Sequence, residues 1–319
     1  MSFTREALER QQVWVYLVAI ALGLALGTLV PQLGPAFEVL LWPVLGVLLY
    51  ATFVQIPLLH LADAFRDHRF IVAVLVGNFV LLPAVIWGLV ALLPPDPVLR
   101  LGVLLVLLVP CTDWFITFSQ LGRGDVSRAI AVTPLNLLLQ LALLPLYLWL
   151  MAGADLSAAL SPADVWPAVL LVLTPLALAA LSERWIDARP ERAARREQLA
   201  WWPVPLLAVV VFLIAAAQVG TVIEALSLLP VVVPLFVAFL VVAALLARVL
   251  ANVFHLNAAQ GRTLAFSMGT RNSFVVLPFA LTLPSGWEVA AVVIVVQSLV
   301  ELFGMVIYLW WLPQKLFPR

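Results

Sequence analysis

The chain has 319 residues, of which 65% are hydrophobic and 11% charged, and its formal net charge is zero. A soluble domain of this length cannot bury so much apolar surface, so the composition excludes an ordinary soluble protein. The balanced charge gives no indication of nucleic-acid binding, and the single cysteine excludes both a disulfide framework and a multi-cysteine metal cage.

Long apolar stretches predict membrane-spanning helices along the whole chain. Each such helix needs roughly 20 mostly apolar residues, and these stretches are too long and continuous for barrel strands, which alternate over short segments. Ten stretches meet the requirement, at about 13–30, 37–57, 70–93, 98–121, 126–152, 164–183, 199–218, 223–253, 258–283 and 286–312. The sequence therefore predicts an all-α membrane protein with ten transmembrane helices.

The basic residues indicate how these helices are oriented. Of 17 Lys and Arg, all but Arg100 and Arg271 fall at the termini or in the even-numbered connections. Cytoplasmic loops carry an excess of such residues. We therefore expect a multi-pass protein of the cell (inner) membrane with both termini in the cytoplasm.

The predicted spans divide into two sets of five, at residues 1–153 and 154–319. Because five is odd, the second set enters the membrane from the opposite side, which predicts two inverted five-helix repeats. The fourth span of each set is interrupted by polar residues, around Cys111 and around Arg271, which lie 160 positions apart in the sequence. Paired broken helices in corresponding halves are typical of secondary transporters and mark their substrate site.

Local chemistry explains both interruptions. Pro110 has no amide hydrogen and clashes with the preceding turn, while Gly269 permits a break in the second helix. Each second half-helix then begins in mid-membrane, where its free N–H groups attract anions or polar oxygens. Asp113 lies at one expected N-cap, and Asn272 or Ser273 at the other.

Three ionisable residues lie deep in predicted spans, where charges are costly and commonly functional: Asp113, Arg271 and Glu301. Asp113 and Arg271 would form either a structural ion pair or part of a substrate site. Glu301 shares a helical face with Gln297, and it is either a proton carrier or an ordinary hydrogen-bonded glutamate. Asn136 and Gln297 are candidates for further polar lining.

Cys111 also has two readings. A lone buried cysteine is usually a small hydrophobic residue. This one lies directly between a helix-breaking proline and a buried aspartate, where its sulfur could bind a soft metal or metalloid that is being transported.

The motifs at the two breaks resemble those of a known superfamily. Pro110-Cys111-Thr112, Leu121–Asp125, Ala131–Thr133 and Thr270–Phe274 resemble the broken fourth and ninth helices and their neighbours in the bile acid/arsenite/riboflavin transporters. The resemblance is closest to the arsenite efflux permeases, and it places their functional cysteine and glutamate at Cys111 and Glu301. It implies a core domain in which helices four and nine cross, and a panel of helices one, two, six and seven.

Some positions depart from the patterns of this superfamily. In the sodium-coupled bile acid branch, a Ser-Asn pair, a Glu and a Gln bind sodium, and the corresponding residues here are Phe115, Ile116, Ser267 and Arg271. These replacements predict transport that does not depend on sodium. Against the arsenite branch, Asp113-Trp114 and Arg271 are both unexpected.

The leading prediction is a secondary transporter that extrudes arsenite, or antimonite, by proton antiport, with Glu301 as the proton carrier and Arg271 keeping Cys111 near its thiolate form. The alternative is sodium-independent transport of a small organic anion held by Arg271. An enzyme is not expected, because the buried polar residues contain no nucleophile–base set. Neither a cofactor nor a bound metal ion is expected. The predicted substrate ligands are Cys111, Thr112, Asp113, Arg271, Asn272 and Ser273.

Overall fold

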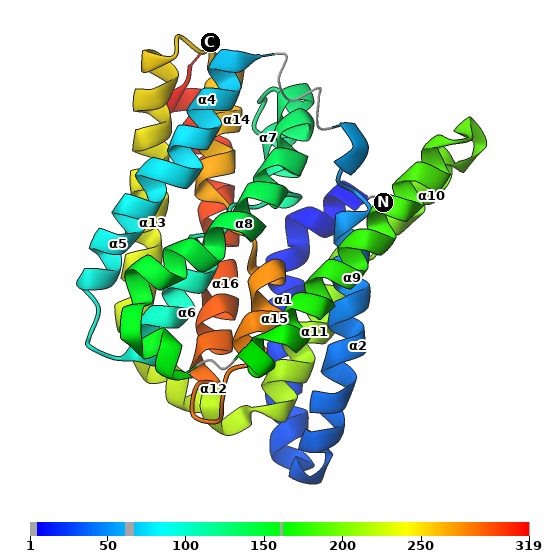
Figure 1. Cartoon of the computed structure of the whole chain (residues 1–319), viewed down its shortest axis with the longest axis vertical. Coiled ribbons are helices and arrows are strands. Elements are labelled where there is room, and N and C mark those ends of the chain that lie inside the picture. The colour runs from blue at the N-terminus through cyan, green and yellow to red at the C-terminus, as the bar shows by residue number, and fades with distance from the viewer. Residues whose placement is uncertain (1–4, 61–66, 160–161, 319) are drawn as a thin grey trace. The chain divides into compact units, whose positions relative to one another are not determined.

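The computed structural model describes residues 5–60, 67–159 and 162–318, and within these ranges every regular element is a helix (Figure 1). Arg66 and Arg319, two of the expected cytoplasmic cations, lie outside the described residues. In the first half the helices are α1 Arg5–Leu29, α2 Gly34–Phe53, α4 His68–Val76, α5 Leu82–Ala91, α6 Pro97–Leu107, α7 Trp114–Leu121 and α8 Val126–Ala159. In the second half they are α9 Pro162–Asp187, α10 Ala193–Leu199, α11 Pro203–Ala217, α12 Val219–Ala225, α13 Leu229–Val253, α14 Ala258–Gly269, α15 Ser273–Leu281 and α16 Val289–Trp311. Short helical turns complete the set at Pro31–Leu33, Leu58–His60, Gly77–Leu81, Pro190–Arg192, Leu226–Leu228 and Leu312–Leu316.

Eight helical segments of the described chain are long and apolar enough to cross a membrane, which makes this a multi-pass membrane protein. They are Gln11–Leu29, Pro31–Phe53, His68–Ala91, Val126–Met151, Trp166–Asp187, Ala193–Ala217, Val219–Val253 and Val289–Leu316. The two other predicted spans, 98–121 and 258–283, are each made of two shorter helices, α6 with α7 and α14 with α15. The interruptions expected from the sequence are therefore present.

The chain forms two compact units, each drawn from both halves of the sequence. The first unit contains Met1–Gln55 and Val165–Leu228, and the second contains Ile56–Asp164 and Leu229–Arg319. The first unit therefore holds the first, second, sixth and seventh predicted spans, the same helices that the superfamily resemblance assigns to a panel. The division into repeats at residues 1–153 and 154–319 stays a prediction.

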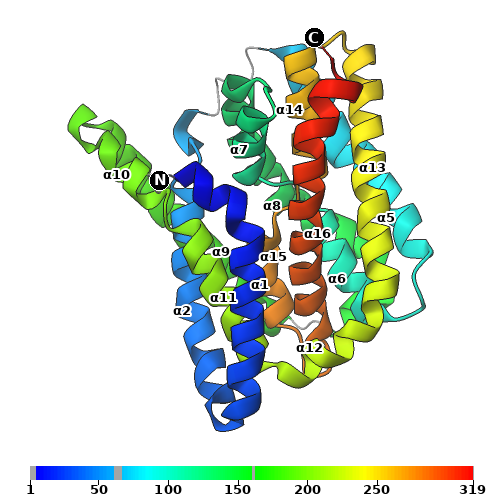
Figure 2. The ribbon, with the colours of Figure 1, turned by 180° about the vertical axis from the view of Figure 1, so that it is seen from behind.

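In the first unit, α11 packs against both α1 and α2 (Figure 2). Gly23 and Gly27 of α1 face the backbone carbonyls of Phe212 and Ala216, and a Cβ at either glycine would overlap those oxygens. Small residues four apart let two membrane helices approach closely, where dispersion contacts hold them together. The Gly23-xxx-Gly27 pattern is therefore the contact surface of α1.

In the second unit, α13, α14 and α16 run side by side, and α6 packs on α16 (Figures 1 and 2). Gly102 of α6 permits close packing, because a Cβ there would lie 3.0 Å from the Cα of Ala290 in α16. The hydroxyl of Tyr308 donates to the carbonyl oxygen of Leu240, which joins α16 to α13. Within this unit, α6 and α14, the first halves of the two interrupted helices, therefore pack against α16, and α14 also packs against α13.

Candidate functional site

The two interrupted helices meet through their backbones at the breaks. Pro110 and Arg271 form an isolated antiparallel bridge. The amide of Cys111 donates to the carbonyl of Thr270 at 3.1 Å, and the amide of Asn272 donates to the carbonyl of Val109 at 2.8 Å. The missing amide hydrogen of Pro110 does not weaken the bridge, because the amides of Cys111 and Asn272 are its donors. The bridge satisfies backbone groups that membrane lipid would leave unpaired.

Both second half-helices carry the N-caps that the sequence predicts. The Asp113 carboxylate accepts from the amide of Trp114 at 2.8 Å, and the Asn272 side chain accepts from the amide of Val275 at 3.3 Å. Asn272 also donates to the hydroxyl of Thr112 at 2.9 Å, which joins the two breaks through their side chains. The predicted capping roles of Asp113 and Asn272 are therefore confirmed.

Cys111 is a free, buried cysteine whose thiol donates to the Asp113 carboxylate at 3.1 Å. The sulfur therefore has a carboxylate as its immediate polar partner. The sequence predicts that Arg271 acts on this thiol. The guanidinium of Arg271 instead donates hydrogen bonds to Leu107, Asn78 and Met268.

The Arg271 side chain is buried and binds mainly backbone oxygens. One terminal nitrogen donates to the carbonyl of Leu107 at 3.1 Å. The other donates to the carbonyl of Met268 at 2.6 Å and to that of Ser267 at 3.3 Å. These carbonyls lie at the C-terminal ends of α6 and α14, where helix dipoles favour a cation. Arg271 therefore caps both first half-helices.

Asn78 supplies the remaining acceptor for Arg271, at 2.9 Å from the same terminal nitrogen. Its amide also donates to the hydroxyl of Ser267 at 3.1 Å. Asn78 lies in a π-helical turn, Gly77–Leu81, inside an otherwise α-helical span. Such turns often occur at functional sites, and this one directs Asn78 toward the break in the second interrupted helix.

The ion pair between Asp113 and Arg271 that the sequence suggested is not among the contacts of the guanidinium. Arg271 instead meets a carboxylate through its backbone. Its amide donates to Glu301 at 2.8 Å, so the glutamate holds one side of the bridge between the two breaks.

Glu301 belongs to a line of polar side chains along α16. Gln297 donates to the same Glu301 oxygen at 2.7 Å, and the Ser273 hydroxyl lies 3.3 Å from the Gln297 carbonyl oxygen. Ser298 donates to Ser273 at 2.7 Å. The other Glu301 oxygen is buried and has no hydrogen-bond partner among the described residues, which leaves a position for a proton.

Among the predicted site residues, one lies apart from this cluster. Asn136 of α8 is buried, and neither its amide nitrogen nor its oxygen has a hydrogen-bond partner among the described residues. Gln140, one turn later on the same helix, is also buried, and its amide nitrogen and oxygen also lack a hydrogen-bond partner among the described residues. No hydrogen bond joins either residue to the two breaks. Unpaired buried amides are costly and call for a polar solute or water.

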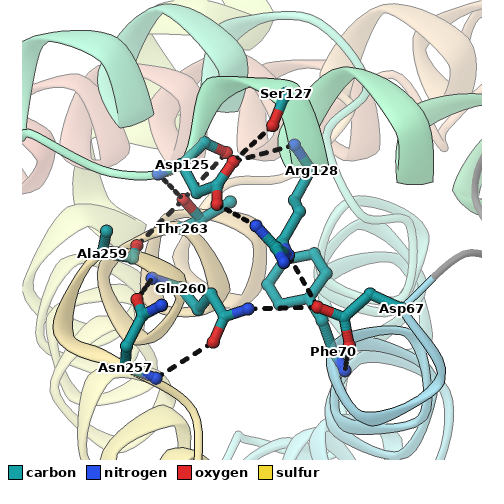
Figure 3. A network of polar contacts seen from close by, with 9 residues as sticks. All are labelled: Asp67, Phe70, Asp125, Ser127, Arg128, Asn257, Ala259, Gln260 and Thr263. Carbon is teal, nitrogen blue, oxygen red and sulfur yellow. Dashed lines mark hydrogen bonds and ion pairs between the residues drawn. The ribbon is translucent and has the colours of Figure 1, made fainter.

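A second polar cluster ties together the ends of three helices (Figure 3). Arg128 of α8 donates to Asp67 at 2.7 Å and also pairs with Asp125. Gln260 of α14 donates to Asp67 at 3.1 Å, and the amide of Asp125 donates to the Thr263 hydroxyl at 2.7 Å. The cluster therefore fixes the start of α14 against the starts of α4 and α8.

Electrostatics favours the charged form of both aspartates in this cluster. Partial burial opposes ionisation of Asp67, but the hydrogen bonds from Arg128 and the Phe70 amide outweigh it and hold the pKa below the ordinary value. Burial likewise opposes ionisation of Asp125, and hydrogen bonds from Ser127 and Arg128 lower its pKa in the same way. Both carboxylates therefore stabilise the folded state.

Arg262 adds a third connection near this end of the second unit. It donates to the carbonyl of Arg123 at 3.0 Å and to the carbonyl of Phe317 at 2.7 and 3.1 Å. These bonds join α14 to the loop after α7 and to the C-terminal segment. The sequence identifies Arg262 only as a cytoplasmic cation, because backbone acceptors have no sequence signature.

Comparison with known proteins adds one family. The model of the sodium bile acid symporter family matches residues 42–225, which is more than half of the chain and includes the first break. No curated protein matches the chain. The match supports the superfamily that the motifs resemble, while the arsenite branch stays a prediction. The chain therefore belongs to the sodium bile acid symporter family of membrane transporters.

Proposed function

We propose that this protein is a secondary active transporter that extrudes arsenite, or the related antimonite, across the cell (inner) membrane in exchange for protons. Family membership supports transport of a small solute. The observation that carries the choice of solute is the buried Cys111 thiol beside Asp113, at the bridge between two interrupted helices. Sulfur is the preferred donor for a soft metalloid.

The chemistry at Cys111 is a reversible exchange of ligands on arsenic. Arsenous acid is a neutral molecule with three hydroxyl groups. The sulfur forms a bond to arsenic while one arsenic–oxygen bond breaks, and the displaced hydroxyl leaves as water with the thiol hydrogen. Asp113, which already accepts from the thiol, relays that hydrogen. One sulfur bond releases more readily than a three-thiol cage, and Thr112, Asn272 and Ser273 bind the remaining hydroxyls.

Glu301 is the proposed proton carrier. Its ionised form accepts from the Arg271 amide and from Gln297. Protonation weakens both bonds, because a neutral carboxyl is a poorer acceptor than a carboxylate. Arg271 is one of the two bridged residues, and the Cys111 amide makes one of the two bridge bonds. Protonation of Glu301 and occupancy of the cysteine therefore act on the same backbone junction.

The finer architecture belongs to the same proposal. We infer ten transmembrane helices in two inverted five-helix repeats, with helices four and nine crossing in the core and both termini in the cytoplasm. Counting α6 with α7, and α14 with α15, as one interrupted span each adds two spans to the eight continuous ones. A transporter of this design needs no enzymatic activity.

A second candidate is transport of a small organic anion, which the bile acid in the family description supports. Its independence of sodium rests on the replacement of the expected sodium ligands by Phe115, Ile116, Ser267 and Arg271. In that mechanism Arg271 would hold the anion with its terminal nitrogens. Those nitrogens already donate to three carbonyls and to Asn78. An incoming carboxylate would have to displace these acceptors. This geometry makes the anion the weaker of the two candidates.

Expression in an arsenite-sensitive host tests the proposal. The wild-type protein should confer resistance, and Cys111→Ser should abolish it at unchanged protein level, because a hydroxyl can still bond to Asp113 but cannot replace sulfur toward arsenic. Gly88→Ala is the matched control, since a Cβ at Gly88 meets nothing within 4 Å. Resistance that persists in Cys111→Ser would refute the role of the thiol.

A further inference from the structure

The first unit contains a groove between α2 and α9 that the proposed transport does not use. Its volume is about 830 Å³, within the range of roughly 300–1,000 Å³ typical of ligand sites. From α2 the groove is lined by Trp42, Gly46 and Val47, and from α9 by Leu170, Leu171 and Leu178. Among the lining residues, Pro43, Gly46 and Tyr50 of α2 are spaced by three, four and seven, as are Leu171, Pro175 and Leu178 of α9, which places each set on one helical face.

A smaller polar pocket of about 310 Å³ shares Tyr50 and Ser182 with this groove. The Tyr50 hydroxyl and the Ser182 hydroxyl lie 2.9 Å apart. Arg195 and Gln198 also line the pocket, as does Trp185. The apolar groove therefore leads into a polar, basic end.

The three arginines near α10 differ in their partners. Arg192 stacks on Trp185, 3.9 Å from the ring centroid, and donates to its carbonyl. Arg196 lies 3.4 Å from Asp187. Arg195 lines the pocket and has no hydrogen-bond or ion-pair partner among the described residues. The pocket thus presents a cation that no described protein carboxylate neutralises.

We propose that this groove and pocket bind one anionic phospholipid, with an acyl chain in the groove and the phosphate at Arg195. The lining from Trp42 to Tyr50 and from Pro167 to Ser182 spans roughly 12 to 22 Å of helix, close to the depth of one leaflet, about 15 Å. Trp185 and Trp202 at the polar end suit the interface between hydrocarbon and headgroups. A basic pocket between membrane helices is a recognised headgroup site.

The surroundings favour lipid over a second copy of the chain. The groove lies along the spans Pro31–Phe53 and Trp166–Asp187, and the most apolar window of the latter is 28% buried, the smallest share among the eight spans of the described chain. A face this open within the membrane meets hydrocarbon directly. Arg195 at the polar end of the groove favours a ligand with an anionic headgroup. Packing of two apolar helix faces against each other would not require a cation at this place.

Lipid binding to the purified full-length protein in detergent tests this inference independently of the transported solute. Native mass spectrometry would follow titrations with dioleoyl phosphatidylglycerol and with dioleoyl phosphatidylcholine. We expect the wild type to bind phosphatidylglycerol more tightly, and Arg195→Gln to weaken that binding about fivefold, the effect of one basic residue near a membrane surface. Arg189→Gln removes the same charge from an exposed residue outside the pocket and should leave the affinity unchanged.

A second pair of variants tests the apolar part. Thr174 lines the groove and adjoins Leu173, which is 45% exposed but does not line it. Thr174→Trp should reduce binding of both lipids, while Leu173→Trp should not. Equal binding by Arg195→Gln and Arg189→Gln, or by the two tryptophan variants, would overturn the site. A stable dimer that binds neither lipid would overturn it in favour of a subunit contact.

Discussion

Arg271 is a buried cation whose partners are mainly main-chain oxygens. It neutralises the carbonyl ends of α6 and α14, and its own amide is held by Glu301. A guanidinium suits this task because its planar fork offers several donors in fixed directions. One side chain therefore serves both interrupted helices.

Removing this side chain should destabilise the protein strongly. Arg271→Ala leaves the Leu107 and Met268 carbonyls and Asn78 without a donor, and we expect a loss of about 3–5 kcal/mol. Arg271→Lys should restore little, because an ammonium cannot reach acceptors on both helices. Thermal unfolding in detergent would measure both variants.

The double variant with Asp113→Ala separates this account from a direct ion pair. Arg271 and Asp113 have different hydrogen-bond partners, so the double variant should be less stable than either single one. Recovery of stability in the double variant would show that the two charges compensate each other directly.

Glu301→Gln tests the proton carrier. The amide oxygen can still accept from the Arg271 amide, so the unfolding temperature should stay close to that of the wild type. Accumulation driven by a pH gradient should be lost, while exchange of arsenite for arsenite across vesicles should persist, because exchange moves no net proton. Glu288→Gln, which replaces the carboxylate at the N-cap of the same helix, is the control. Gradient-driven accumulation by Glu301→Gln would exclude this residue as the carrier.

At the scale of elements, close approach of helices depends on glycine. Gly23→Leu should separate α1 from α11, since even a Cβ at this position would lie 3.0 Å from the Cβ of Ala215 and closer still to the Phe212 carbonyl oxygen. We expect a destabilisation of about 1–3 kcal/mol, typical of overpacking. Gly88→Leu places the same side chain where nothing lies within 4 Å, and it should unfold like the wild type. Equal unfolding temperatures for both variants would contradict the packing.

The polar cluster around Arg128 gives stability that depends on pH. Because the pKa of Asp67 is lowered on folding, its contribution is complete above the unfolded value of about 3.8 and is lost as the pH falls through the lower folded value. Asp67→Asn should therefore lower the unfolding temperature at pH 7 by about 2 °C, as for a partly exposed pair. The difference should shrink as the pH falls below 3.8 toward the lower folded value. A difference that stays constant with pH would rule out this linkage.

The parts of the site that sequence alone reveals are those set by local chemistry. The sequence predicts the roles of Pro110 and Gly269, and of the caps Asp113 and Asn272, because each of them acts on its own neighbouring backbone. The hydrogen-bond acceptors of Arg271 cannot be predicted from the sequence, because every residue has a carbonyl oxygen. Asn78 was missed because it is uncharged and follows an apolar run, although a polar residue in mid-span is a usable signal.

At the scale of the whole molecule, apolar length predicts where the helices lie but not how they group. The predicted ranges coincide with helices because each needs only its own sequence to be apolar. The two compact units join segments far apart in the chain, such as α1 with α11. That grouping depends on contacts such as Gly23 with Phe212, which a single sequence does not specify.

Transport by the purified protein in vesicles tests the central claim most directly. Vesicles with an acidic interior would be placed in alkaline buffer containing arsenite, once with sodium and once with choline in its place. Antiport predicts that arsenite accumulates as protons leave, equally in both buffers, because Phe115, Ile116, Ser267 and Arg271 replace the expected sodium ligands. Cys111→Ser vesicles should accumulate none. A strict requirement for sodium, or no accumulation of arsenite under the proton gradient, would contradict the account.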